Sequence, residues 1–270
     1  MLHTEPVMGT VVSIDVPTLG PGGSGRAIDQ VVRWLHWVDT TFSTYNHDSE
    51  VSRLGRGELS VEECHPHVQV VLSLCEHLHQ RTGGYFDAWA GGHLDPSGLV
   101  KGWSIDQASA LLTTAGWPDH AIDGGGDVRL RGRPAGGGEA AGSVGDAGRA
   151  PWQVALRHPF RPGAFCTVVA LEEGAVATSG VYERGYHVID PHCGERATSI
   201  AAVSVIGPCL AMADAYATAA LAMGPQAPAW LEALPDHEAF LIDSSGAGWE
   251  TAGFARYRLD IPQAPSRAVR

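Results

Sequence analysis

An acid and an alcohol stand four residues apart in the sequence, at Asp214 and Thr218. If this segment is helical, the two side chains lie on one face. A carboxylate and a hydroxyl are hard oxygen ligands of the kind that magnesium prefers, and they leave positions for water and phosphate oxygens. The alternative is structural: an Asp near a helix start and a Thr whose hydroxyl bonds back to the helix. Taken alone, the pair favours the structural alternative, so other residues must decide.

A lysine and a run of glycines mark two places for a phosphate or a ribose. Lys101-Gly102 enters an expected helix from a loop that contains Gly98, and it can present an ammonium group and free backbone N–H groups, which favour phosphate. The segment is not a Walker motif. Gly124-Gly125-Gly126-Asp127 would let a ligand approach the backbone, with Asp127 accepting from ribose hydroxyls. The structural alternatives are an exposed lysine at a helix start and a tight turn.

One histidine is a candidate for proton transfer. His187 lies one residue inside an expected strand at 186–190, which ends at Asp190-Pro191. Histidine gains and loses its proton near neutral pH, so His187 is a candidate general base. A structural histidine is the alternative. No Gly-x-Ser-x-Gly motif marks an α/β-hydrolase nucleophile, and Ser179-Gly180 is expected to be a turn.

Hydrophobic periodicity assigns the elements that must position these residues. Helices are expected near 26–41, 66–81, 103–116, 209–223 and 226–234, and strands near 10–16, 152–157, 165–171, 175–178, 186–190, 201–206 and 238–243, with two short strands on either side of 123–127. Because strands come in runs with helices interspersed, the sequence predicts an α+β fold with mixed sheets flanked by helices. The chain, 1–270, is expected to form a single domain.

A stretch at 133–150 stands apart in composition, because it is rich in Gly, Ala and Pro and has almost no bulky apolar residue. We expect it to be a flexible surface insertion.

The overall charge and the cysteine pattern exclude several kinds of partner and fold. The formal net charge is −12, which argues against nucleic acid and against anionic lipid as partners. The five cysteines are odd in number and include no C-x-x-C, so a disulfide framework is not expected. No run of about twenty apolar residues predicts a transmembrane helix. The N-terminus shows no signal peptide, so the chain as it stands is expected to be cytoplasmic, or extracytoplasmic if a signal segment was removed.

The order of these motifs resembles the ApbE family of FAD:protein FMN transferases, from about residue 7 to 243. The matching segments are Met8-Gly9-Thr10, Phe42-Ser43-Thr44-Tyr45, Gly83-Gly84-Tyr85-Phe86-Asp87, Asp95 through Lys101-Gly102, Gly125-Gly126-Asp127, Ala177-Thr178-Ser179-Gly180, His187-Val188-Ile189-Asp190-Pro191 with Gly194, and Ala213-Asp214-Ala215 with Thr218. One departure is Pro96-Ser97, where a more apolar, small-residue stretch is usual, so that loop is expected to differ in shape.

The resemblance implies an ApbE-like flavin transferase fold and a set of site residues. Magnesium would be held by a main-chain oxygen of Gly98 and by the side chains of Asp214 and Thr218, and His187 and Asp214 would act in catalysis. The residues implied to contact FAD are Met8, Tyr45, Tyr85, Phe86, Asp87, Asp95, Lys101 and Ile189, to which the glycine run adds Asp127.

The activity implied by the resemblance is magnesium-dependent transfer of FMN from FAD to a threonine hydroxyl of an acceptor protein, with release of AMP. The acceptor would be a subunit of a redox complex. Two alternatives remain open at this point: an FAD pyrophosphatase that yields FMN and AMP, and a protein that binds FAD without turnover.

Overall fold

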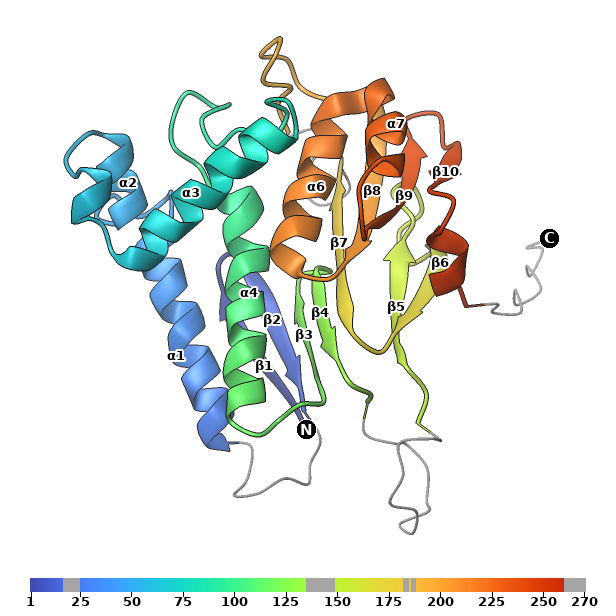
Figure 1. The fold of residues 1–270 in the computed structure, drawn as a ribbon, viewed down its shortest axis with the longest axis horizontal. Coiled ribbons are helices and arrows are strands. Elements are labelled where there is room, and N and C mark those ends of the chain that lie inside the picture. The colour runs from blue at the N-terminus through green and yellow to red at the C-terminus, as the bar shows by residue number, and fades with distance from the viewer. Residues whose placement is uncertain (17–24, 135–148, 182–184, 186–187, 260–270) are drawn as a thin grey trace.

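An eight-stranded sheet forms the centre of the molecule (Figure 1). The structure, a computed structural model, describes residues 1–16, 25–134, 149–181, 185 and 188–259. The strands in spatial order are β1 (Leu2–Val7), β2 (Thr10–Asp15), β3 (His120–Gly124), β4 (Val128–Arg131), β7 (Gly174–Gly180), β8 (Ile200–Gly207), β9 (Glu238–Asp243) and β10 (Gly248–Glu250). A separate two-stranded sheet consists of β5 (Trp152–Arg157) and β6 (Phe165–Leu171).

The α+β class expected from the sequence is confirmed, but the expectation of mixed sheets is wrong. Every strand pair in the described residues is antiparallel. For the hairpins the reason is the short connection: β1 and β2, for example, are joined by Met8-Gly9 alone, and so short a turn can only reverse the chain. Met8 and Gly9 have φ angles of 54° and 70°, as a type I′ hairpin requires.

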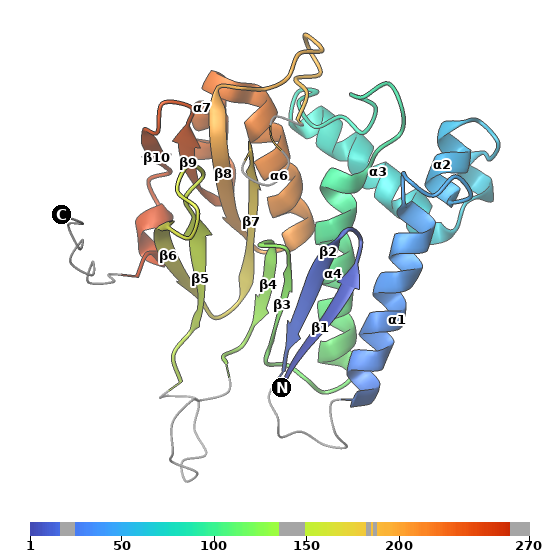
Figure 2. The same ribbon diagram turned by 180° about the vertical axis from the view of Figure 1, so that it is seen from behind.

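Helices cover one face of the large sheet, and the small sheet lies against the other (Figures 1 and 2). No helix in the described part of the chain has the length and apolarity needed to cross a membrane. The helices are α1 (Gly25–Phe42), α2 (Glu50–Gly55), α3 (Pro66–Arg81), α4 (Ser97–Thr114), α6 (Leu210–Met223) and α7 (Ala227–Glu232), with short 3-10 turns at Val61–Glu63, Gly224–Gln226 and Phe254–Tyr257.

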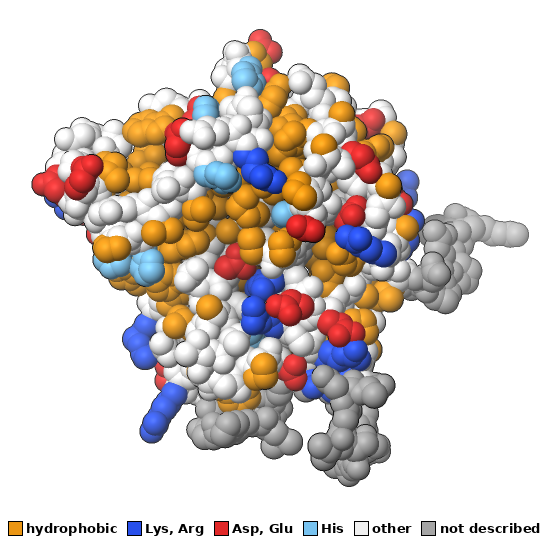
Figure 3. Space-filling view, viewed as in Figure 1, with side chains coloured by type: hydrophobic (Ala, Val, Ile, Leu, Met, Phe, Trp, Pro, Cys, Tyr) orange, Lys and Arg blue, Asp and Glu red, His pale blue; other side chains and the backbone are white. Residues whose placement is uncertain are grey.

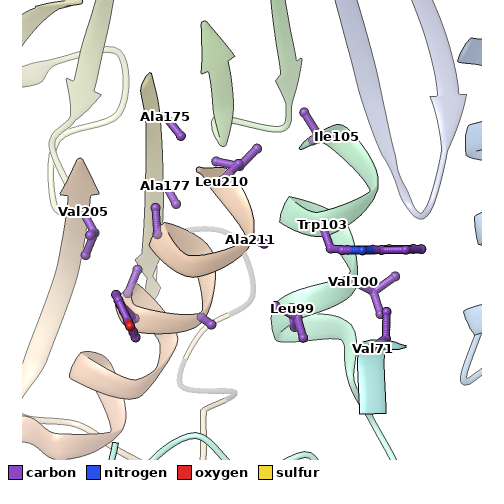
Figure 4. Close-up of a cluster of buried hydrophobic side chains, with 14 of the residues drawn as sticks. Val71, Leu99, Val100, Trp103, Ile105, Ala175, Ala177, Val205, Leu210 and Ala211 are labelled. Atoms are coloured by element: carbon purple, nitrogen blue, oxygen red, sulfur yellow. The ribbon is translucent and has the colours of Figure 1, made fainter. Parts of the chain in front are cut away.

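The two faces of the sheet hold two hydrophobic cores. Side chains alternate along β7, so Ala175 and Ala177 face the helices, while Val176 packs in the cluster under β5 and β6. Figure 4 shows the alanines of β7 beside α6, which is rich in alanine and buried on nearly all sides. A helix that is apolar all round belongs in a protein interior, and small side chains on both elements let α6 lie close to the sheet.

The third helix begins earlier than the sequence predicts. It starts at Ser97 rather than near Trp103, because the Asp95 carboxylate accepts a hydrogen bond of 3.0 Å from the Ser97 backbone N–H and starts the first turn after Pro96. Lys101 therefore lies in the second turn of α4 and not at its entrance. Of the strand expected at 186–190, residues 186 and 187 lie outside the described residues, and within 188–190 Ile189 makes an isolated bridge with Arg196.

Most of the insertion expected at 133–150 lies outside the described residues, which resume at Arg149. Its two ends meet at one place. Arg149 donates from Nε to the carbonyl oxygen of Pro134 at 2.9 Å, and its Nη1 forms an ion pair of 2.8 Å with Asp119. The chain therefore leaves and rejoins the fold at a single point near the start of β3.

His120, at the start of β3, is fully buried and held neutral. Its Nδ1 donates to the Trp117 carbonyl at 2.8 Å, so Nε2 accepts from the Ser109 hydroxyl at 2.7 Å. Burial is the main cause that lowers the pKa of His120 from 6.5 to about 4.

We expect this histidine to make folding stability depend on pH. Because its folded-state pKa is depressed, the unfolded chain binds the proton first, and stability falls as pH drops from about 6.5 to about 4. The difference in unfolding free energy between wild type and His120→Gln should shrink by roughly 3 kcal/mol over that window. Urea denaturation at several pH values measures it, and a constant difference would contradict it.

Candidate functional site

Helices α4 and α6 lie side by side and run antiparallel, and they bring the predicted residues together (Figure 1). A Cβ added to Gly98 would lie 3.6 Å from the Thr218 hydroxyl, and one added to Gly102 would lie 2.6 Å from the Leu210 carbonyl oxygen. Two residues four apart on α4, Gly98 and Gly102, therefore meet two residues eight apart on α6, Thr218 and Leu210. The backbones touch at Gly102, where no larger residue fits without moving a helix.

A lysine lies between two buried carboxylates in this helix pair. Lys101 forms an ion pair with Asp127, and its Nζ lies 3.9 Å from Oδ2 of Asp214. The two acids are only 2% and 4% exposed. Asp127 comes from the turn between β3 and β4, and its Oδ1 accepts a 2.8 Å hydrogen bond from the Thr178 backbone N–H. The cluster thus concentrates charge in a place where water screens it only in part, since both carboxylates are buried.

Hydroxyl groups complete the cluster on the side of Thr218. Its Oγ1 lies 3.1 Å from Oγ of Ser179 in β7. The expectation that Ser179-Gly180 is a turn is wrong, since both residues belong to the strand. The alternation of side chains along β7 could have predicted this position of Ser179. Ser179 is two residues after Ala177, so both side chains point to the face that α6 covers.

The oxygen groups gathered here are of the kind that binds magnesium. The Asp214 carboxylate, the Thr218 hydroxyl and the Ser179 hydroxyl are all hard oxygen groups. Gly98 presents no side chain toward Thr218, and this leaves its backbone accessible to the same place. Among the described residues, no three His, Cys, Asp or Glu side chains gather as a metal site. A cation here would therefore depend on one carboxylate, hydroxyl and main-chain oxygens, and oxygens from substrate or water.

The predicted flavin residues of the 85–95 segment lie beside the start of α4. The buried Phe86 ring is 3.3 Å from a Cβ added to Gly98. Tyr85 accepts a hydrogen bond of 3.0 Å from Gln226 through its hydroxyl, and its ring packs edge-on against His192 at 4.4 Å. Asp95 starts α4, as described above. These contacts join the 85–95 segment to both helix α4 and the chain after β7.

A cleft of about 420 Å³ opens next to this segment. Asp87 lines it, and its carboxylate also accepts from the Trp89 backbone N–H at 2.8 Å. The remaining lining residues are His79, Gln80, Gly83, Gly84, Pro191 and His192. Ile189 is two residues from Pro191, so its segment reaches the same cleft.

The remaining predicted residues differ in their placement. Met8 is half-buried at the β1–β2 turn, where its sulfur accepts a 3.7 Å hydrogen bond from Ser104 of α4. Tyr45 is not brought into the cluster, because its side chain is 96% exposed in the loop after α1. His187 lies outside the described residues. On the face seen in Figure 3, acidic and basic side chains are interspersed among hydrophobic ones rather than segregated.

Comparison with known proteins places these features in a family. The model of the ApbE family matches residues 8–93 and 89–241. A protein of Rhodobacter capsulatus named FAD:protein FMN transferase is 34% identical over 141 residues, which are 49% of this chain and 24% of that protein. A protein of the same name from Treponema pallidum (strain Nichols) is 34% identical over 147 residues, covering 51% of this chain and 40% of that protein. The matched region is therefore less than half of each relative's length.

Solved structures share the fold over nearly the whole chain. The ApbE protein of Thermotoga maritima superposes with a TM-score of 0.80 at 20% identity and covers 96% of this chain and 99% of its own. The flavin transferase ApbE from Vibrio cholerae gives a TM-score of 0.80 at 22% identity, with 95% and 98% coverage. The expectation of an ApbE-like flavin transferase fold is confirmed.

Proposed function

Because the chain belongs to the ApbE family, we propose that it is a magnesium-dependent FAD:protein FMN transferase. It would transfer FMN from FAD to a threonine hydroxyl of an acceptor protein, a subunit of a redox complex, and release AMP. The observation that supports this most is the cluster of Lys101, Asp127, Asp214 and Thr218. In this cluster the lysine ammonium group lies beside carboxylate and hydroxyl oxygens suited to magnesium, next to the predicted flavin residues.

Lys101 would bind the pyrophosphate of FAD. Its ammonium group is held by Asp127, and this places the positive charge near the start of α4 before substrate arrives. The Asp127 carboxylate is itself fixed by the Thr178 N–H group. A lysine side chain that is already ordered loses little conformational entropy when the phosphates bind, so the binding free energy is not reduced by the cost of ordering it.

Asp214, Thr218 and the main-chain oxygen of Gly98 would hold magnesium. When bound, the ion would supply Lewis-acid chemistry at the phosphorus under attack. The Ser179 hydroxyl contacts Thr218 and can orient it toward the ion. Phe86 covers Gly98 and keeps bulk water from this side of the cluster.

The transfer step exchanges one phosphorus–oxygen bond for another. The threonine oxygen of the acceptor would bond to the phosphorus of the FMN half, and the bond from that phosphorus to the oxygen shared with AMP would break. AMP would leave with the electron pair of that bond, and Lys101 would offset the negative charge that it gains. The proton of the threonine hydroxyl would pass to a base, for which His187 remains our candidate, and finally to solvent or to AMP.

A direct assay tests the proposal. The protein is mixed with FAD, Mg²⁺ and a domain or peptide that carries a threonine in a short Ser/Thr-rich segment. We expect AMP release by HPLC in equal amount to FMN attached to the acceptor, seen as an added FMN mass, and no reaction with EDTA. Free FMN in the absence of acceptor would indicate hydrolysis instead, and FAD binding with no AMP at all would indicate a protein without turnover.

A further inference from the structure

Helix α6 receives its N-terminal cap from another helix. Its own N-cap residue, Cys209, makes no side-chain cap. Instead, Asp106 of α4 accepts a 3.0 Å hydrogen bond from the Leu210 N–H through Oδ1 and a 2.8 Å hydrogen bond from the Ala211 N–H through Oδ2. The first N–H groups of a helix have no partner within the helix, and here one carboxylate satisfies two of them.

A buried arginine holds this carboxylate in place. Arg129 of β4 is 6% exposed, and its Nε lies 3.4 Å from Oδ1 of Asp106. Its Nη1 donates to the Pro208 carbonyl at 2.9 Å, just before the start of α6. The guanidinium group therefore contacts both the cap and the chain that the cap holds, and it balances the charge of the partly buried acid.

The cap is on the same side of α4 as the proposed magnesium site. Gly98, Gly102 and Asp106 are four residues apart, so they form one stripe along the helix. Asp106 lies about 12 Å along the axis from Gly98, at 1.5 Å per residue. The contacts of Gly98 with Thr218, and of Gly102 and Asp106 with the first turn of α6, all belong to this stripe. Any slide or rotation of α6 would break the two cap bonds.

We propose that Asp106, held by Arg129, is a positioning residue that sets the register of α6 against α4. Through that register it places Asp214, which is one turn beyond the capped residues, and Thr218 relative to Gly98 and Lys101. The inference rests on the proposed function, since it names the residues that hold the proposed magnesium ligands in place. A cap that serves stability alone would leave the metal affinity of the folded protein unchanged.

The test compares Asp106→Asn with Asp119→Asn in the full chain. The asparagine at 106 keeps one acceptor but turns an amide group toward the second N–H, whereas Asp119→Asn removes a partly exposed Asp–Arg ion pair that includes no residue of α6. Mn²⁺ serves as the probe, because free Mn²⁺ is counted directly by electron paramagnetic resonance without any turnover. Hydrogen exchange of the 208–224 segment is measured without metal, and thermal unfolding is followed for each variant.

Asp106→Asn should raise the dissociation constant for Mn²⁺ about tenfold or more, the usual effect of removing a group that orients metal ligands. It should also speed amide exchange in the first turn of α6, and Asp119→Asn should do neither. Excess Mg²⁺ should restore most of the transfer rate of Asp106→Asn. Asp106→Ala should show a larger change in the same direction.

Three outcomes would overturn the inference. The first is wild-type exchange of the 208–224 segment in Asp106→Asn, and the second is an equal loss of Mn²⁺ affinity in Asp119→Asn. The third is that neither Asp106 variant folds while Asp119→Asn does, because Asp106 would then serve folding alone. A wild-type chain that binds no Mn²⁺ contradicts the proposed magnesium site, and the metal-free exchange experiment still decides whether Asp106 fixes α6.

Discussion

Asp214→Ala is expected to abolish FMN transfer while some FAD binding remains. Asp214 supplies the only carboxylate among the proposed magnesium ligands, and its side chain is buried beside Lys101. Without that carboxylate the site would lose the Lewis acid, which contributes several kcal/mol, so the rate should fall on the order of 10³-fold or more. Lys101 and the residues of the 85–95 segment remain, and they should still bind the flavin weakly.

The measurement is the initial rate of AMP release at saturating FAD and Mg²⁺, with FAD binding followed separately by quenching of flavin fluorescence. Asp214→Asn, which keeps the volume and removes the charge, should behave like the alanine variant. Asp119→Asn serves as the control with an acid removed elsewhere. Full activity in either Asp214 variant would remove the metal site from the proposed function.

Lys101→Met should damage both transfer and stability, for separable reasons. The loss of the ammonium group removes the charge that offsets the phosphates, and we expect a fall in rate of at least about 100-fold. The Asp127 carboxylate, 2% exposed, also loses its ion pair. Because the Lys101 side chain is 35% exposed and water screens part of the interaction, the stability loss should be about 2 kcal/mol rather than the larger values for fully buried pairs.

A double variant separates the two effects. Lys101→Met with Asp127→Asn removes both charges, so thermal unfolding should return close to that of wild type while transfer stays lost. Asp127→Asn alone leaves the lysine charged but poorly placed, so it should raise the KM for FAD more than it lowers kcat. If the double variant recovers transfer as well as stability, Lys101 has no role in phosphate binding.

Local patterns in the sequence were enough to place part of the site. The spacing of Asp214 and Thr218 predicts one helix face, and the structure puts both on α6. The glycine run before Asp127 predicts a turn, and the structure has one between β3 and β4. In each case residues within a few positions of one another decide the geometry, so a short window of sequence contains the information.

Other features depend on contacts between distant segments. The polar β1 at the sheet edge was not predicted, because half of its residues are exposed and no apolar alternation marks them. Asp106 shares the spacing of Gly98 and Gly102, but its role appears only once α6 is packed against α4. The antiparallel pairing likewise depends on how the strands are connected in space rather than on any one strand.

The contact between Arg149 and Pro134 has a practical consequence for handling this protein. Because Pro134 and Arg149 already contact each other, the number of residues between them need not change the positions of the elements that they join. Residues can be inserted or removed between these two positions at little cost in folding free energy, since the entropic cost of closing a loop grows only slowly with its length. An affinity tag or a fluorescent reporter inserted between Pro134 and Arg149 should therefore leave the sheet and the helix pair of this protein unchanged.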